Sequence, residues 1–115
     1  MEVQVFGTRK CADTRKAIRF FSERRVKTHF VDLKERAASR REILRFSQKF
    51  GVASLIDQGS QRFEELGLRQ AHYGEARWIE LLEEEPLLLE TPLVRRGSDL
   101  TVGAAEEAWR GWTSG

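Results

Sequence analysis

The stretch from residue 3 to residue 17 most constrains what this chain can fold into. Residues 3–6 are mostly β-formers, and Gly7 ends the apolar run, which predicts a short buried strand. Residues 13–25 carry an apolar stripe at helical spacing opposite a charged face. Residues 28–33 again have the pattern of a strand. A strand, a helix and a strand in direct succession predict a right-handed parallel βαβ unit.

A capping box predicts the start of a second helix. Ser39 and Glu42 have the spacing at which each side chain can bond the other residue's backbone amide. We expect this helix to run to about Lys49 and Gly51 to end it in a left-handed conformation. The predicted core face consists of Ile43, Phe46 and Phe50. We interpret the outer face as an ordinary solvated surface, because no aromatic residues lie among its cations: Arg40, Arg41, Arg45 and Lys49.

The remaining elements are predicted from shorter patterns. Residues 52–70 show only a helical turn at 62–68, whereas residues 75–84 predict a helix, after which Pro86 either interrupts the helix or opens a new turn. Its apolar face is Trp78, Leu81 and Leu82, and the acids at 83–85 are interpreted as a solvated helix end. Two short β segments, 93–95 and 100–102, then predict a hairpin. A final helix is predicted at 105–112, with Trp109 and Trp112 packed on the sheet.

Length and charge narrow the class of protein. A chain of 115 residues predicts a single domain, and 20 Lys and Arg against 18 Asp and Glu, interleaved along the chain, argue against a nucleic-acid binder. We find no apolar run long enough for a membrane span and no signal-peptide pattern, so we expect a cytoplasmic protein without a membrane partner. One cysteine excludes an internal disulfide, and His29 and His72 lack metal-ligand spacing, so no metal site is expected.

Cys11, the only cysteine, is the candidate for chemistry. A free cysteine is commonly a small buried hydrophobe, and the sequence pattern by itself leaves that interpretation open. Its predicted position in the first turn of a helix favours a reactive thiol, because unpaired amides and the helix dipole stabilise a thiolate. Four nearby cations strengthen this expectation: Arg9, Lys10, Arg15 and Lys16. Asp13 is the one nearby acid, and its negative charge would disfavour a thiolate.

Four segments together resemble a known family. They are Val5-Phe6-Gly7-Thr8-x-x-Cys11-x-x-Thr14-Arg15-Lys16-Ala17, Phe63–Leu68, Glu85–Val94 and Leu100–Gly103. In this order and spacing they are similar to the glutaredoxin-linked arsenate reductase (ArsC), Spx and YffB family. The resemblance implies an α/β, thioredoxin-like fold with a central mixed four-stranded sheet. It also implies one domain over 1–115, with a helical insertion at about 37–90 between the βαβ and ββα halves.

The resemblance further implies that Cys11 is the redox cysteine and that Pro92 is a cis-proline facing it. Arsenate reductases of this family also hold the oxyanion with three arginines, and the corresponding positions here are Asp57, Thr91 and about Val102. Because these guanidinium groups are missing, we expect a monothiol reductase rather than an arsenate reductase. Thr14 stands where Spx-type regulators have a second cysteine, so an internal disulfide switch is not available.

We therefore predict a thiol reductase that works through a mixed disulfide at Cys11. The expected catalytic residues are Cys11 and Arg15, with the amides of residues 12–15 around the bound sulfur or oxyanion. The expected substrate- or glutathione-binding residues are Thr8, Lys10, Ala12, Asp13, Thr14, Thr91, Pro92 and Arg95. No bound cofactor is expected; glutathione would be a co-substrate, and glutaredoxin or thioredoxin would be protein partners. The alternative is a non-enzymatic interaction protein, either Spx-like, with the RNA polymerase α subunit as partner, or nitrogenase-associated.

Overall fold

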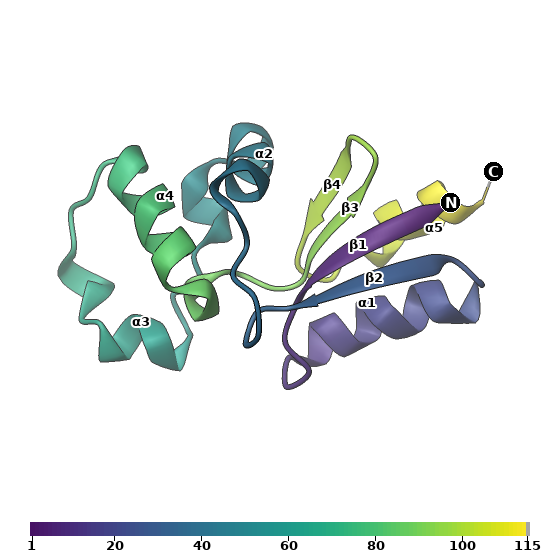
Figure 1. The fold of residues 1–115 in the computed structure, drawn as a ribbon, viewed down its shortest axis with the longest axis horizontal. Coiled ribbons are helices and arrows are strands. Elements are labelled where there is room, and N and C mark those ends of the chain that lie inside the picture. The colour runs from purple at the N-terminus through teal and green to yellow at the C-terminus, as the bar shows by residue number, and fades with distance from the viewer. Residues whose placement is uncertain (115) are drawn as a thin grey trace. The chain divides into compact units, whose positions relative to one another are not determined.

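The structure is a computed structural model, which describes residues 1–114 (Figure 1). Its elements form two compact units, and each is described by itself. The first unit joins Met1–Asp32 with the residues from Thr91 onward, and the second unit is Leu33–Glu90. Within residues 1–114, no helix has the length and apolar character that crossing a lipid bilayer requires.

The first unit is built on a four-stranded sheet in the order β2-β1-β3-β4. Strand β1 is parallel to β2 and antiparallel to β3, and β3 is antiparallel to β4. The sheet is therefore mixed, as predicted, and the predicted parallel βαβ unit and hairpin are both present. The strands are β1 Glu2–Gly7, β2 Lys27–Asp32, β3 Leu93–Arg96 and β4 Asp99–Val102.

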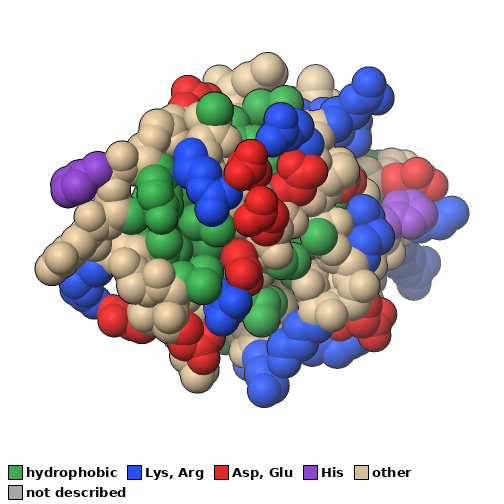
Figure 2. Space-filling view, turned by 60° about the vertical axis from the view of Figure 1, so that its left-hand side comes forward, with side chains coloured by type: hydrophobic (Ala, Val, Ile, Leu, Met, Phe, Trp, Pro, Cys, Tyr) green, Lys and Arg blue, Asp and Glu red, His purple; other side chains and the backbone are tan. Residues whose placement is uncertain are grey.

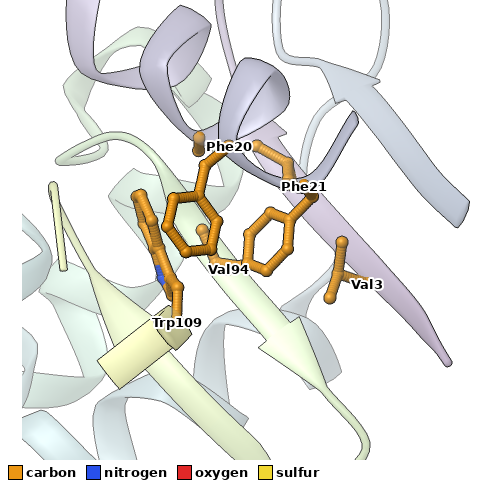
Figure 3. Packing of buried hydrophobic residues seen from close by; sticks show 7 residues of the cluster. Val3, Phe20, Phe21, Val94 and Trp109 are labelled. Atoms are coloured by element: carbon orange, nitrogen blue, oxygen red, sulfur yellow. The ribbon is translucent and has the colours of Figure 1, made fainter. Parts of the chain in front are cut away.

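Two helices, α1 Ala12–Glu23 and α5 Glu106–Thr113, pack their aromatic side chains against this sheet. Figure 3 shows Phe20 and Phe21 of α1 beside Trp109 of α5. The ring centroids of these three residues are 5.2 to 5.6 Å apart. Burying a large apolar side chain of this kind contributes about 1.5–3 kcal/mol. Trp109 is fully buried, and its Nε1 donates to Thr101 Oγ1 of β4 at 2.8 Å. The predicted packing of Trp109 is therefore confirmed, while Trp112 is partly buried beside it.

The second unit is helical. Its helices are α2 Arg40–Phe50, α3 Gln61–Glu65 and α4 Glu75–Glu84, with 3₁₀ turns at Val52–Leu55, Leu68–Gln70 and Pro86–Leu88. The predicted capping box is present, because Glu42 N donates to Ser39 Oγ and Ser39 N donates to Glu42 Oε1. Gly51 follows α2 with φ 82° and ψ 148°. The predicted end of the helix at Gly51 with a left-handed, positive φ is therefore confirmed, although its ψ is extended.

The apolar face of α4 differs from the predicted one. Ile79, Leu81 and Leu82 are buried, whereas Trp78 is half-buried. The Trp78 ring packs edge-on against Tyr73 of the preceding loop, with ring centroids 5.2 Å apart. Tyr73 is itself exposed, so this contact leaves Trp78 at the surface. The sequence pattern of the helix alone does not contain this contact.

The acidic end of α4 also forms contacts that the sequence did not predict. Arg62 of α3 bonds Glu85 with two parallel hydrogen bonds, Nε to Oε2 at 2.8 Å and Nη2 to Oε1 at 2.9 Å. The guanidinium lowers the pKa of the Glu85 carboxyl from its ordinary 4.5. Glu83 pairs with Arg40 at 3.1 Å. These acids are thus ion-pair partners within the second unit.

Candidate thiol site

Cys11 is the N-cap of α1, at the end of the loop that follows β1. Its backbone is extended, with φ −76° and ψ 119°, and its side chain is partly exposed. Cys11 N donates to Thr8 O at 3.1 Å, which closes the loop. Arg15 N donates to Cys11 O at 3.1 Å, so this amide is engaged in the helix. The predicted cradle of amides therefore does not extend to residue 15.

The sulfur faces a segment that lies 80 residues further along the chain. Cys11 Sγ donates to the carbonyl oxygen of Thr91 at 3.7 Å. The Thr91-Pro92 peptide bond is cis, as the family resemblance implied. The carbonyl of Pro92 accepts a hydrogen bond from Gly103 N at 2.8 Å, which fixes this segment beside the end of β4. Two distant parts of the first unit thus define the surroundings of the thiol.

The pKa of the Cys11 thiol is lowered from its ordinary 9.0. Burial by itself raises the pKa, because it removes water from the thiolate. Polar groups close to the sulfur outweigh burial and lower the pKa: they are the side chains of Thr14 and Thr91 and the backbone amides of Thr14 and Asp13. The first turn of α1 therefore stabilises the charged form of the sulfur, as a helix N-terminus does for an anion.

Thr14 is fully buried, and its Oγ1 makes no hydrogen bond of good geometry with the neutral thiol or with any other group in residues 1–114. It nevertheless faces the sulfur closely enough to lower the thiol pKa. A hydroxyl that lacks a partner beside the thiol gains one when the sulfur becomes a thiolate, which is a strong acceptor. The position of Thr14 thus favours deprotonation of Cys11.

Gly7, the last residue of β1, makes room for this threonine. A Cβ atom at Gly7 would lie 2.3 Å from Thr14 Oγ1 and 2.6 Å from its Cγ2. Real Cβ atoms do not approach other atoms so closely, so only glycine fits with Thr14 in place. From the sequence, Gly7 was predicted only to end the first strand, and this contact with Thr14 was not predicted.

Three of the cations near Cys11 contact groups other than its sulfur. Arg15 Nη1 donates to Arg9 O at 2.8 Å, and the Arg9 guanidinium lies over the Phe30 ring, 4.9 Å from its centroid. Lys16 pairs with Glu106 of α5 at 3.9 Å. Arg15, predicted as catalytic, thus donates to the backbone of the loop in this structure, and its catalytic role stays a prediction.

Most of the predicted binding residues gather around Cys11. The loop and the first turn of α1 supply Thr8, Lys10, Ala12, Asp13 and Thr14 on one side of the sulfur. The cis-proline segment supplies Thr91 and Pro92 on the other side. The Thr91 carbonyl was not among the predicted groups. It could have been suspected only from the resemblance, because neither its direction nor its distance is visible in the sequence.

Arg95 lies apart from this group, and its predicted part in binding stays a prediction. Its Nε donates to Gly97 O at 2.7 Å, and it lies opposite Gln4 near the start of β1. Arg95 is three positions along the extended chain from Pro92, a distance of about 10 Å. Its side chain lines a different hollow, with Glu2 and His29.

None of the three positions at which arsenate reductases of the family have an arginine carries a cation in this chain. Thr91 contributes its carbonyl to the thiol, and Val102 pairs with Leu93 in the sheet. Asp57 lies in the second unit, where its Oδ1 accepts from Gly59 N at 3.1 Å. Among residues 1–114 there is also no group of three His, Cys, Asp or Glu side chains suited to holding a metal ion.

The chain is similar to several known proteins. The chain is 31% identical to global transcriptional regulator Spx 2 of Oceanobacillus iheyensis, over 93% of this chain and 80% of that protein. Among solved structures it is similar to a YffB protein, with a TM-score of 0.85, 24% identity and coverage of 95% and 96% of the two chains. It is also similar to arsenate reductase from Vibrio cholerae, with a TM-score of 0.81, 21% identity and 94% of each chain covered.

These likenesses confirm the thioredoxin-like fold expected from the sequence. The model of the ArsC family matches residues 6–112, nearly the whole chain and all of the thiol site. This chain therefore belongs to the ArsC family.

Proposed function

We propose that the protein is a monothiol disulfide reductase whose nucleophile is Cys11. The observation that carries this proposal is the group of hydrogen-bond donors around the sulfur. Thr14 and the amides of Asp13 and Thr14 lower the pKa of a thiol that is still partly exposed. A thiolate that solvent can reach is the species that attacks disulfides.

The reaction starts with a protein thiol that carries glutathione as a mixed disulfide. The Cys11 thiolate attacks the glutathione sulfur, a Cys11–glutathione disulfide forms, and the protein sulfur leaves as a thiolate. A second glutathione thiolate then attacks this disulfide on the glutathione sulfur. Oxidised glutathione leaves, and Cys11 returns as a thiolate, so each turnover consumes one glutathione thiol and exchanges the protein–glutathione disulfide for oxidised glutathione. Glutaredoxin or thioredoxin would serve as the alternative thiol donor.

Cys11 being the only cysteine supports an external donor. Thr14, one helical turn along α1, has a hydroxyl where a resolving thiol would be needed for an internal disulfide. Thr91 and Pro92 would line the opposite wall and receive the peptide backbone of the bound thiol. The missing arginines argue against arsenate as substrate.

The test combines a titration with a mass measurement. The rate of Cys11 alkylation as a function of pH should give a thiol pKa below 9.0, and oxidised glutathione should add one glutathione to the wild type and none to Cys11→Ser. The wild type should then release glutathione from a glutathionylated peptide, with arsenate inactive as substrate. An ordinary thiol pKa together with no glutathione adduct would exclude the reductase.

A second candidate function rests on the 31% identity to Spx 2, a global transcriptional regulator. On this proposal the chain is an interaction protein that binds the RNA polymerase α subunit, and Cys11 serves as a sensor. A chemical-shift titration with that subunit distinguishes the two. Binding in the absence of any glutathione adduct would favour the interaction protein over the reductase.

A further inference from the structure

We propose that the outer face of α2 binds an acidic helical segment of another protein. A hollow of about 550 Å³ lies on this face, and we call it the α2 groove. Its lining consists of Arg40, Arg41, Leu44, Arg45 and Gln48. Three of these five residues are cations and none is an acid. From the sequence, this face was interpreted as a solvated surface with several cations. The hollow was not predicted from the sequence and is seen only in the structure.

Two of the three cations in the α2 groove have no acidic partner. Arg40 Nε donates to Glu83 Oε2 at 3.1 Å. Arg41 and Arg45 form no ion pair within the part of the chain that the structure describes, residues 1–114. They are four residues apart and so lie on the same side of the helix. Two guanidinium forks at this spacing match carboxylates one helical turn apart on a partner.

The groove also offers an apolar contact. Leu44 lies between the two arginines in sequence and is half-buried, and Gln48 extends the same face by one turn. An amphipathic helix binds through apolar anchors at helical spacing, with charged residues beside them. A partner helix with a leucine between two glutamates would therefore meet an apolar group and two cations in matching order.

A protein segment suits this groove better than a nucleic acid does. No aromatic side chain lines the groove, so bases would find no ring to stack on. The second unit as a whole contains nine Lys and Arg against eleven Asp and Glu. Figure 2 shows acidic and basic side chains next to each other on the face it presents. A long polyanion would meet repulsion outside the groove, whereas a short acidic helix would contact only the groove.

The test uses a fluorescent peptide of Glu, Leu and Ala with leucines along one helical face and glutamates beside them. Anisotropy should show saturable binding to the wild type, and Arg41→Glu with Arg45→Glu should weaken it by about tenfold or more. Leu44→Ala should weaken it by about threefold. The matched control is Arg19→Glu with Arg110→Glu, which makes the same charge change in a separate hollow of about 300 Å³ between α1 and α5.

Four outcomes would overturn the proposal. The first two are that the peptide does not bind the wild type, and that the control variant loses as much peptide affinity as the groove variant. The third is that duplex DNA binds the groove as tightly as the peptide does. The fourth is that the wild type forms a concentration-dependent dimer that the groove variants abolish. Circular dichroism of each variant shows whether the helices remain intact. Cys11→Ser should bind the peptide as the wild type does, so this proposal and the thiol chemistry can fail separately.

Discussion

Thr14 occupies the space that a side chain at residue 7 would need, with its Oγ1 only 2.3 Å from where a Cβ on Gly7 would lie. This contact joins the end of β1 to the first turn of α1, directly beside Cys11. The packing of the first unit and the acidity of its thiol therefore depend on the same pair of residues.

Gly7→Ala should lower the free energy of unfolding by about 1–3 kcal/mol, because the new methyl group must displace Thr14. It should also raise the Cys11 thiol pKa, since the hydroxyl moves away from the sulfur. Denaturant unfolding and alkylation against pH measure the two effects. The control is Gly111→Ala in α5, where a Cβ meets nothing within 4 Å and the thiol pKa should not change. A Gly7→Ala protein as stable as the wild type would contradict the contact.

Thr14→Val should raise the pKa of the Cys11 thiol and slow its reaction at neutral pH, because the hydroxyl donor is lost. The stability of the fold should stay equal or increase, since a buried hydroxyl without a well-formed hydrogen bond is replaced by a methyl group of similar shape. Thr14→Ser, which keeps the hydroxyl, should retain a lowered pKa. Alkylation kinetics of the three proteins would show whether the hydroxyl or the helix amides matter more.

The contribution of Cys11 to stability should depend on pH. Its pKa is lower in the folded protein than the ordinary 9.0. The stabilisation from the thiolate is therefore fully present above the unfolded pKa and is lost as the pH falls through the folded pKa. The difference in unfolding free energy between the wild type and Cys11→Ala should increase from neutral to alkaline pH. A constant difference across this range would show that the thiol pKa is unchanged on folding.

The Arg62–Glu85 pair should stabilise the second unit except at acid pH. The carboxyl pKa is lowered from 4.5, so this stabilisation is present above 4.5 and is lost as the pH falls through the folded value. Glu85→Gln should lower the melting temperature at pH 7, and the difference from the wild type should disappear in strong acid. Glu84→Gln is the matched control, because Glu84 makes only a longer contact, 3.7 Å, with Arg77.

Trp109→Phe should destabilise the first unit by about 1–3 kcal/mol, because it leaves Thr101 Oγ1 without its indole donor and opens space in the core. Thr101→Val alone should cost a similar amount. The double variant should cost less than the sum, since neither group is then left unpaired. Urea unfolding of the four proteins completes this cycle, and additive effects would argue against the hydrogen bond.

The sequence predicted those features that depend on local pattern. The capping box at Ser39 and Glu42 was correct because both partners lie within one helical turn. The helix at 75–84 has the predicted bounds, but its buried face was wrong at Trp78, because the ring packs on a residue outside the helix. Periodicity describes the helix alone and contains no information about its neighbours.

The thiol site was predicted in part. Cys11 and the first turn of α1 follow from local sequence, and the cis-proline came from the resemblance to the family. Arg95 was included among the predicted binding residues, but its strand places it opposite Gln4, apart from the others. The contact between Gly7 and Thr14 could not be predicted, because it depends on how a strand end meets the following helix.

The division of the first unit between the two ends of the chain has a consequence during synthesis on the ribosome. The β1 strand emerges early, but its antiparallel neighbour β3 begins only at Leu93, after the whole of the second unit. One edge of β1 therefore stays unpaired while some sixty further residues are translated. The second unit, which is continuous in sequence, is therefore fully synthesised before the thiol site can form.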